Sequence, residues 1–257
     1  MVWHLAGSFE LMSFFRFLRF DVHQGQCAHR VGTDAMLLGA WTRAGKGRIL
    51  DVGTGSGVLA LMLAQRSDQA EIDAIEPDRP SAAQASENVA ASPWPERIRI
   101  QPCRLQDWAP DYCYDLIVCN PPYFDELTQA KGEARHLARH SASLSREALI
   151  RHAQRLLAPG GRLALVLPLA YGDELIALAG QSGLYPQRSC VVRHSPTHAP
   201  KRLLIELGKQ QAASEAGSLA IRDLNGLYSA DYRALTSVYH SLAPPLEYDR
   251  ARARAQV

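Results

Sequence analysis

The chain has 257 residues, 47% of them apolar and 21% charged, with a formal net charge of +2. These values are typical of one large globular domain, and they exclude a uniformly basic protein, so any basic face must be local. No run approaches the roughly 20 apolar residues of a membrane span. The five cysteines form no CxxC pair or regular framework, which favours a reducing cytoplasm.

The predicted elements alternate regularly after residue 46. Before that point, the aromatic and basic residues of 15–20 indicate a half-buried hairpin, although their rings could also stack on bases. The expected strands are 47–53, 70–78, 98–103, 114–120, 161–169, 189–195 and 201–208. The expected helices are 56–67, 80–92, 146–161 and 173–183. Because the strands are continuously apolar, we expect a mostly parallel sheet of seven strands with helices on both faces, a doubly wound α/β fold.

Three regions make up the predicted organisation. Residues 1–45 form an N-terminal extension that covers the site, 46–243 form the main domain, and 244–257 form a tail that begins with two prolines. A polar, charged insertion over 124–145 interrupts the main domain.

A glycine-rich turn follows the first core strand, in the sequence DVGTGSG. Gly53, Gly55 and Gly57 remove the Cβ atoms that would keep a ligand from the backbone, and the next helix starts with free N–H groups. The spacing departs from the GxGxxG of dinucleotide sites and suits a nucleoside with an amino-acid tail. Glu76, which ends the second strand, can accept hydrogen bonds from both ribose hydroxyls. The alternative is a tight turn and a solvent-facing acid, but carboxyl ends of adjacent strands favour ligand binding.

A second motif ends the fourth core strand, where DLIVC runs into NPPYF, and we expect it at the same edge of the sheet as the glycine-rich turn. One proline is enough to stop a strand, so the second proline and the tyrosine indicate chemistry. An exocyclic amine such as adenine N6 is a poor nucleophile because its lone pair is delocalised into the ring. Asn120 Oδ1 and the Pro121 carbonyl could accept its two N–H groups and draw the nitrogen toward tetrahedral geometry, while Pro121 and Pro122 hold the acceptors rigidly. Tyr123 could stack on the base. The alternative is a proline-terminated strand with an aromatic plug.

These motifs together resemble the class I S-adenosylmethionine-dependent methyltransferases that act on planar amide or amine nitrogen. The segment 14–42 with its VGTDAMLLGAW element, the SPW at 92–94 and NPPYF extend the likeness to bacterial tRNA (adenine-N6) methyltransferases. Those enzymes modify the adenosine 3′ to the anticodon of a valine tRNA. The resemblance covers roughly residues 13–240. It implies a Rossmann-like methyltransferase domain, S-adenosylmethionine as cofactor, tRNA as partner, and direct in-line methyl transfer to N6.

The resemblance also assigns roles to cofactor residues. Asp51, Gly53, Gly55 and Gly57 would line the methionine portion of the cofactor, and Glu76 would bind its ribose.

The VGTD element and the strand-end motif receive roles in the same way. Thr33 and Asp34 would lie near the cofactor or close over it. The residues that would hold the target adenine are Asn120, Pro121, Pro122 and Tyr123. Two positions depart from the family pattern: Arg30 replaces a lysine and keeps its charge but not its shape. Arg104 replaces an acid that contacts the cofactor adenine, and although Asp107 is close, that contact stays unassigned.

Basic residues gather after the NPPY motif. We expect Lys131, Arg135 and Arg139, together with Arg30, to contact RNA phosphates, with an affinity that falls as salt rises. A solvated helix face is the alternative. A second, scattered cluster surrounds the last strands: Arg188, Arg193, His194, His198, Lys201 and Arg202.

No metal site is expected. His136 and His140 are four residues apart, but no third ligand or catalytic glutamate stands nearby.

Other activities stay open on sequence alone. Methylation of glutamine N5 in a protein uses the same NPPY logic, but such enzymes carry a longer N-terminal helical domain. DNA adenine-N6 methylation would require a sequence-reading domain, which we do not see. A non-catalytic RNA adaptor that binds S-adenosylmethionine has no need for Asn120 and Tyr123, and a nicotinamide-dependent oxidoreductase is disfavoured by the glycine spacing. We therefore expect a cytoplasmic tRNA (adenine-N6) methyltransferase that acts as a monomer or weak dimer.

Overall fold

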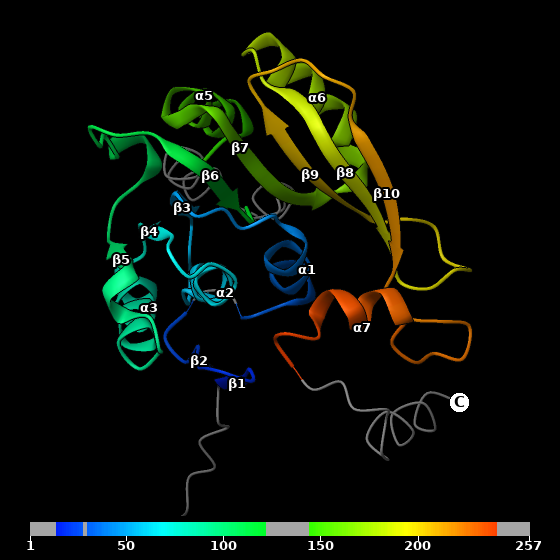
Figure 1. The fold of residues 1–257 in the computed structure, drawn as a ribbon, viewed down its shortest axis with the longest axis horizontal. Helices are drawn as coiled ribbons and strands as arrows, with labels where there is room; N and C mark the ends of the chain where they lie inside the picture. The colour runs from blue at the N-terminus through cyan, green and yellow to red at the C-terminus, as the bar shows by residue number, and fades with distance from the viewer. Residues whose placement is uncertain (1–13, 28–29, 122–143, 241–257) are drawn as a thin grey trace, which may run out of the picture.

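One large sheet forms the centre of the molecule, with helices on both of its faces (Figure 1). The computed structural model describes residues 14–27, 30–121 and 144–240. Within these ranges the sheet has eight strands in the order β10-β8-β9-β7-β6-β3-β4-β5, and five of its seven pairings are parallel. In chain order the strands are β3 (Arg48–Val52), β4 (Glu71–Ile75), β5 (Ile98–Gln101), β6 (Tyr114–Cys119), β7 (Leu157–Pro168), β8 (Tyr185–Arg193), β9 (Arg202–Gly208) and β10 (Glu215–Ala220).

The helices divide between the two faces. In chain order they are α1 (Thr33–Trp41), α2 (Val58–Arg66), α3 (Arg79–Ala90), α5 (Arg146–Leu156), α6 (Gly172–Gln181) and α7 (Ala230–Thr236). Short 3₁₀ turns are η1 (Pro95–Arg97), η2 (Leu105–Asp107) and η3 (Leu169–Tyr171). α1, α2 and α7 contribute to one hydrophobic core, and α5 and α6 to the other.

Both cores draw on the same strands. Ile49 belongs to the core under α2, whereas its neighbour Leu50 belongs to the core under α5, and both are fully buried. Successive strand residues point to opposite faces, so a strand covered on both sides must be apolar throughout. The predicted doubly wound α/β fold is confirmed.

The strand count differs from the seven that we predicted. β10 adds an eighth strand, which pairs in parallel with β8 and is the outermost strand on that side of the sheet. Only Leu219 of this strand is buried, so the segment carries no apolar pattern that could announce it. The boundary between the helix predicted over 146–161 and the strand predicted over 161–169 also differs, because α5 ends at Leu156 and β7 begins at Leu157. The pairing of β7 with β6 shifts register between Tyr114 and Leu116.

The predicted N-terminal hairpin is present. β1 (Phe14–Arg16) pairs antiparallel with β2 (Asp21–His23), and the rings of Phe17 and Phe20 in its turn stack at 4.3 Å. α1, which we did not predict as a helix, follows the hairpin and packs on α2.

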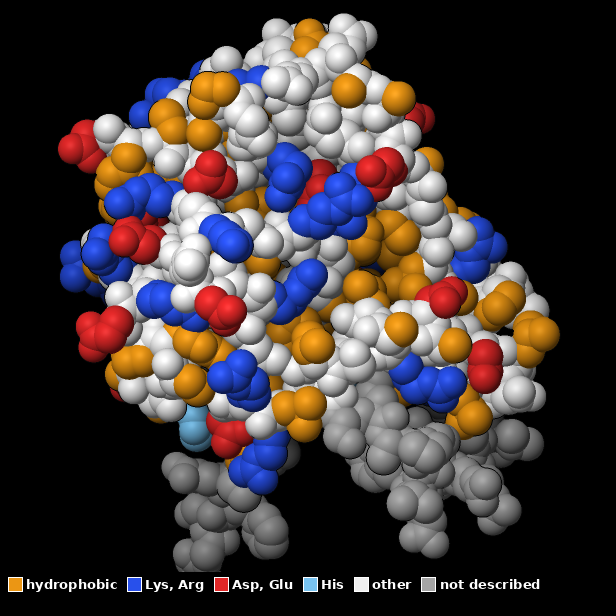
Figure 2. Space-filling model, in the orientation of Figure 1, with side chains coloured by type: hydrophobic (Ala, Val, Ile, Leu, Met, Phe, Trp, Pro, Cys, Tyr) orange, Lys and Arg blue, Asp and Glu red, His pale blue; other side chains and the backbone are white. Residues whose placement is uncertain are grey.

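Charges of both signs are interspersed over the face shown in Figure 2, in keeping with the small net charge. Among the described helices, none has the length and apolar character needed to cross a bilayer.

Candidate functional site

A glycine and two polar residues directly follow three neighbouring strands at one edge of the sheet. The register pairs Val52 of β3 with Ile75 of β4 and with Cys119 of β6. The next residue on each strand is therefore Gly53, Glu76 or Asn120, and the three lie in one row. Adjacent strands are about 4.8 Å apart, so the row spans about 10 Å, which suits a small molecule and its reaction partner. The predicted convergence of the two motifs on one sheet edge is confirmed.

The glycine-rich loop leaves open space above its backbone. Gly53, Gly55 and Gly57 have φ angles of +69°, +56° and +83°, in the left-handed region that favours glycine. A Cβ atom at Gly53 or Gly55 would meet no atom within 4 Å, so the loop is open on that side. At Gly57 a Cβ would touch Ala85 of α3 at 3.5 Å, so this glycine serves the packing of α2 against α3. The loop fits a ligand that approaches its backbone closely.

Asp51 supports the loop from the interior of the sheet. Its carboxylate is fully buried, and Oδ2 accepts hydrogen bonds from Thr54 Oγ1 at 2.5 Å and from the Ala60 amide at 3.1 Å. Oδ1 has no partner among the described residues. Burial raises the pKa of Asp51 to about 7, although the two hydrogen bonds oppose this rise. A buried carboxylate with an unpartnered oxygen directly below the loop is consistent with a site that a polar ligand completes.

Glu76 connects the loop to the start of α3. Oε2 accepts a hydrogen bond from the Gly55 amide at 2.9 Å, and Oε1 accepts one from the Asp78 amide at 3.0 Å. A carboxylate offers about four acceptor positions, so each oxygen keeps one for a further donor. Asp78 in turn caps α3 by accepting from the Ser81 amide and hydroxyl, bonds that hold the pKa of Asp78 below its usual range. Glu76 is thus a fixed acceptor suited to vicinal hydroxyls.

The described part of the strand-end motif is Asn120 and Pro121. Asn120 is half-buried directly after β6, and no described residue hydrogen-bonds to its amide group. Pro121 is buried and lines a small apolar hollow between β7, α5 and α6. Pro122 and Tyr123 lie outside the described residues.

The VGTD element lies at the N-terminus of α1. Thr33 is exposed. The Asp34 carboxylate accepts from Nε of Arg202, at 3.2 Å through Oδ1 and 3.1 Å through Oδ2. Arg202 is the first residue of β9 and pairs with Pro168, the last of β7. The ion pair therefore anchors this end of α1 to the edge of the sheet that carries the row. Sequence reasoning placed Arg202 in a basic cluster and missed this partner, because the two residues are 168 positions apart.

The predicted RNA contacts are only partly within the described chain. Arg30 is exposed just before the VGTD element, whereas Lys131, Arg135 and Arg139 lie outside the described residues. Arg104, which departs from the family pattern, is exposed after β5.

Asn88 is a positioning residue that the sequence did not reveal. Its Nδ2 donates to the carbonyls of Ser56, in the glycine-rich loop, and of His23, and its Oδ1 accepts from the His23 amide. This buried amide joins the loop to the N-terminal hairpin. A single asparagine in a helical pattern gives no signal of such a role.

Several known proteins are similar to this chain in sequence. The family model of the methyltransferase small domain matches residues 30–175. The tRNA1(Val) (adenine(37)-N6)-methyltransferase of Tolumonas auensis is 45% identical over 228 residues, which cover 88% of this chain and 96% of that protein. The protein of the same name from Parabacteroides distasonis is 43% identical over 231 residues, 88% of this chain and 97% of that one.

Solved structures share the fold at lower identity. A "predicted O-methyltransferase" of Agrobacterium tumefaciens has a TM-score of 0.61 at 22% identity and covers 80% of this chain and 96% of its own. The ribosomal protein L11 methylase of Lactobacillus delbrueckii subsp. bulgaricus has a TM-score of 0.52 at 19% identity, covering 74% and 84%. The Rossmann-like methyltransferase fold implied by the sequence is confirmed.

Proposed function

Because the chain belongs to the methyltransferase small domain family and to the tRNA1(Val) (adenine(37)-N6)-methyltransferases, we propose that it methylates N6 of an adenine in tRNA. The proposed target is the adenosine 3′ to the anticodon of a valine tRNA. The observation that carries the proposal is the row formed by Gly53, Glu76 and Asn120, which sets an open glycine loop and a fixed carboxylate beside an amide acceptor.

S-adenosylmethionine supplies an electrophilic methyl group on its sulfonium sulfur. The backbone of Gly53 and Gly55 would border its methionine portion, and Gly57 and the buried carboxylate of Asp51 would keep the loop in shape. Glu76 would accept hydrogen bonds from its ribose hydroxyls with the acceptor positions that Gly55 and Asp78 leave unused. Thr33 and Asp34, held at the same edge by Arg202, would border the cofactor from the other side.

Asn120 and the residues after it would prepare the target amine. The Asn120 Oδ1 and Pro121 carbonyl would accept its two N–H groups, which localises the nitrogen lone pair for attack. Rigid acceptors that bind best when the nitrogen becomes tetrahedral favour the transition state over the ground state. Pro122 would limit the movement of this segment, and Tyr123 would stack on the base, with the base turned out of the RNA stack.

The cellular setting follows from the substrate. A tRNA-modifying enzyme with free cysteines would work in the cytoplasm, and we propose a monomer or weak dimer. Arg30, Lys131, Arg135 and Arg139 would contact tRNA phosphates near the target.

The test uses labelled S-adenosylmethionine and an unmodified valine tRNA transcript, digested to nucleosides after the reaction. Label is expected in N6-methyladenosine, and an A-to-G change beside the anticodon should abolish it. Cofactor binding without label in RNA would contradict the proposal and direct the search to protein glutamine and DNA adenine.

Replacement of Asn120 tests the proposed amine acceptor. The Asn120→Ala variant should lose methyl transfer by a factor of about 10²–10³, the usual effect of removing one preorganised hydrogen-bonding group. Its affinity for S-adenosylmethionine, measured by calorimetry, should be nearly unchanged. Equal losses in transfer and in cofactor affinity would contradict the role of this residue.

A further inference from the structure

Two loops leave the sheet at the edge that carries the row. β9 begins at Arg202 opposite Pro168, the end of β7, and β8 runs antiparallel to β9, so it ends at this edge with Arg193. β10 is parallel to β8 and ends beside it, with Ala220 opposite Arg193. The loop 194–201 after β8 and the loop 221–229 after β10 therefore project from this edge, and Figure 1 shows them in yellow and orange at the right of the view.

Backbone hydrogen bonds join the two loops into one surface. The Ile221 amide donates to the Arg193 carbonyl at 3.0 Å, and the Arg222 amide donates to the His194 carbonyl at 2.8 Å. The Lys201 amide donates to the Val192 carbonyl at 2.9 Å, which closes the first loop at its base. The side chains of this surface are held by an ordered backbone.

The surface carries unpaired positive charge. Arg193 and Lys201 form no ion pair with any residue that the structure describes, and Lys201 is exposed. Arg222 lies over the ring of Tyr228 at 4.6 Å. The nearby Asp223 accepts from the Asn225 and Leu227 amides within its own turn and pairs with no described cation.

Aromatic rings lie among these cations. His194 and His198 are exposed and their ring centroids are 5.1 Å apart, while Ser195 contacts Nδ1 of His198 at 2.7 Å. The ring of Tyr228 stacks on that of Tyr232. Flat rings beside cations are the combination that RNA-binding surfaces use for phosphates and bases.

The strand order gives the distance between this surface and Asn120. Asn120 follows β6, and the strand order places β8 three strands and β10 four strands away from it. With strands about 4.8 Å apart, the two loops lie roughly 14–19 Å from the amine acceptor along the edge. A stacked nucleic acid strand advances about 3.4 Å per phosphate, so this distance corresponds to roughly four to six phosphates.

We propose that this surface, formed by Arg193, His194, His198, Lys201 and Arg222, binds the phosphate backbone of the substrate RNA beside the methylated nucleotide. The inference deepens the proposed function and rests on it. Separate cations spread along an edge match a regular array of phosphates, and the spacing places the contact within the anticodon arm. Arg188, which the sequence grouped with this cluster, does not belong to it, because it lies in the first half of β8, five residues before Arg193, in an ion pair with Glu206.

The test measures the salt dependence of RNA binding. The full-length protein would be titrated, with S-adenosylhomocysteine present, into a labelled valine tRNA transcript and into a hairpin of its anticodon arm, at several KCl concentrations. Each lost phosphate contact lowers the slope of log affinity against log salt by about 0.7–0.9. The double variant Arg193→Gln with Lys201→Gln should therefore bind both RNAs more weakly, with a slope reduced by about 1.4–1.8.

A matched double variant controls for net charge. Lys46→Gln with Arg99→Gln also removes one lysine and one arginine, both of them exposed residues, and Lys46 precedes β3 at the opposite edge of the sheet. This control should keep the slope of the unaltered protein. Equal slopes for the two double variants, or a loss seen with tRNA but not with the hairpin, would overturn the proposal.

The outcome is separate from that of the proposed function. If the unaltered protein binds the RNA but methylates no adenine in it, the proposed function fails, and the slopes still decide whether this surface contacts phosphate. If the protein methylates RNA and the Arg193 and Lys201 variant binds it normally, only the surface is rejected, and an acidic protein segment becomes its better partner.

Discussion

A single buried carboxylate, Asp51, shapes the loop on which the proposed cofactor site depends. It accepts hydrogen bonds from Thr54 and Ala60, yet burial raises its pKa from an ordinary 3.8 to about 7. The folded protein therefore holds this proton more tightly than the unfolded chain does. The contribution of Asp51 to stability is full below about pH 4 and is lost as the pH rises toward 7.

Replacing Asp51 by asparagine should remove this pH dependence. The difference in unfolding free energy between the unaltered protein and Asp51→Asn should shift against the unaltered protein as the pH rises from 4 to 7. Urea unfolding of both proteins without cofactor, at a series of pH values, measures it. A difference that stays constant over this range would show that Asp51 titrates normally.

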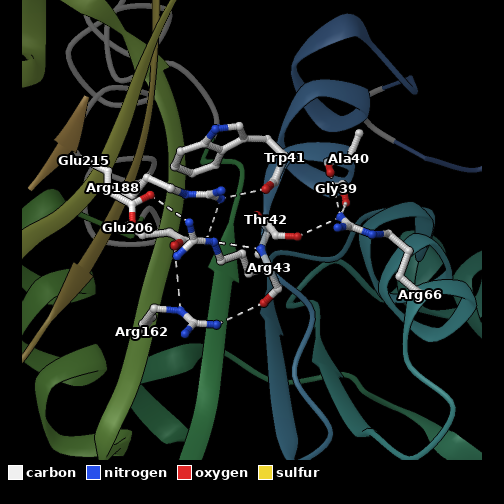
Figure 3. Close-up of polar contacts among 10 residues, drawn as sticks. All are labelled: Gly39, Ala40, Trp41, Thr42, Arg43, Arg66, Arg162, Arg188, Glu206 and Glu215. Atoms are coloured by element: carbon white, nitrogen blue, oxygen red, sulfur yellow. Dashed lines mark hydrogen bonds and ion pairs between the residues drawn. The ribbon is translucent and has the colours of Figure 1, made fainter. Parts of the chain in front are cut away.

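At the scale of elements, α1 is fixed at both ends. Asp34 pairs with Arg202 at the site edge. At the opposite end, Arg66 donates to the carbonyls of Gly39, Ala40 and Thr42, and Arg188 donates to that of Trp41 while lying over its ring at 3.7 Å (Figure 3). The last carbonyls of a helix lack intrahelical donors, so these guanidinium groups donate the missing hydrogen bonds. They also place positive charge at the negative end of the helix dipole, which is favourable.

Glu206 lies at the centre of the contacts that hold the C-terminal end of α1. It is 1% exposed and pairs with Arg188 at 3.0 Å and Arg162 at 3.7 Å, while also accepting from the Arg43 amide (Figure 3). Its partners come from β7, β8 and the segment after α1, so one carboxylate joins the antiparallel part of the sheet to the helix that faces the site.

Removal of Glu206 should be costly. Glu206→Ala leaves the partly buried guanidinium groups of Arg188 and Arg162 without their nearest counter-charge and should lower the unfolding free energy by up to about 3–5 kcal/mol. Glu215→Ala breaks the exposed pair with Arg43 and should cost about 0–1 kcal/mol. Denaturant midpoints compare the two variants directly, and similar losses would mean that burial of Glu206 adds nothing.

At the scale of the whole molecule, the two ends of the described chain close over the same helices. The Leu18 amide, in the hairpin turn, donates to the Tyr239 carbonyl, and the ring of Phe17 meets that of Tyr239 edge-on at 6.2 Å. The Tyr239 hydroxyl lies within hydrogen-bond distance of two carbonyls, and its single proton points to that of Met62 in α2 at 2.9 Å or to that of Gly39 in α1 at 3.3 Å. The core beneath the site thus depends on residues more than 200 positions apart.

Two substitutions of Tyr239 separate its packing from its hydrogen bonds. Tyr239→Phe keeps the ring and should lower the unfolding free energy by about 1 kcal/mol. Tyr239→Ala empties a fully buried site and should cost about 3–5 kcal/mol, with a single cooperative transition in both variants. Unfolding in urea measures both, and a similar cost for the two would assign the stability to the hydroxyl alone.

Local patterns in the sequence were enough for the core strands, the glycine loop and the strand-end motif. Continuous apolar runs, φ-permissive glycines and paired prolines act within a few residues, so they are legible without a structure. Strand ends in a parallel sheet share an edge, so the convergence of Gly53, Glu76 and Asn120 also followed from the sequence.

Only the tertiary structure decided the rest, because it depends on register and on distant partners. β10 forms with one buried apolar residue because a neighbouring strand offers it a ladder of hydrogen bonds. Antiparallel pairing of β8 sends Arg188 to a buried ion pair and Arg193 to the site edge, although the two are five positions apart. A basic cluster in sequence thus became a structural anchor and a surface, since five positions along an extended strand separate two residues by about 17 Å.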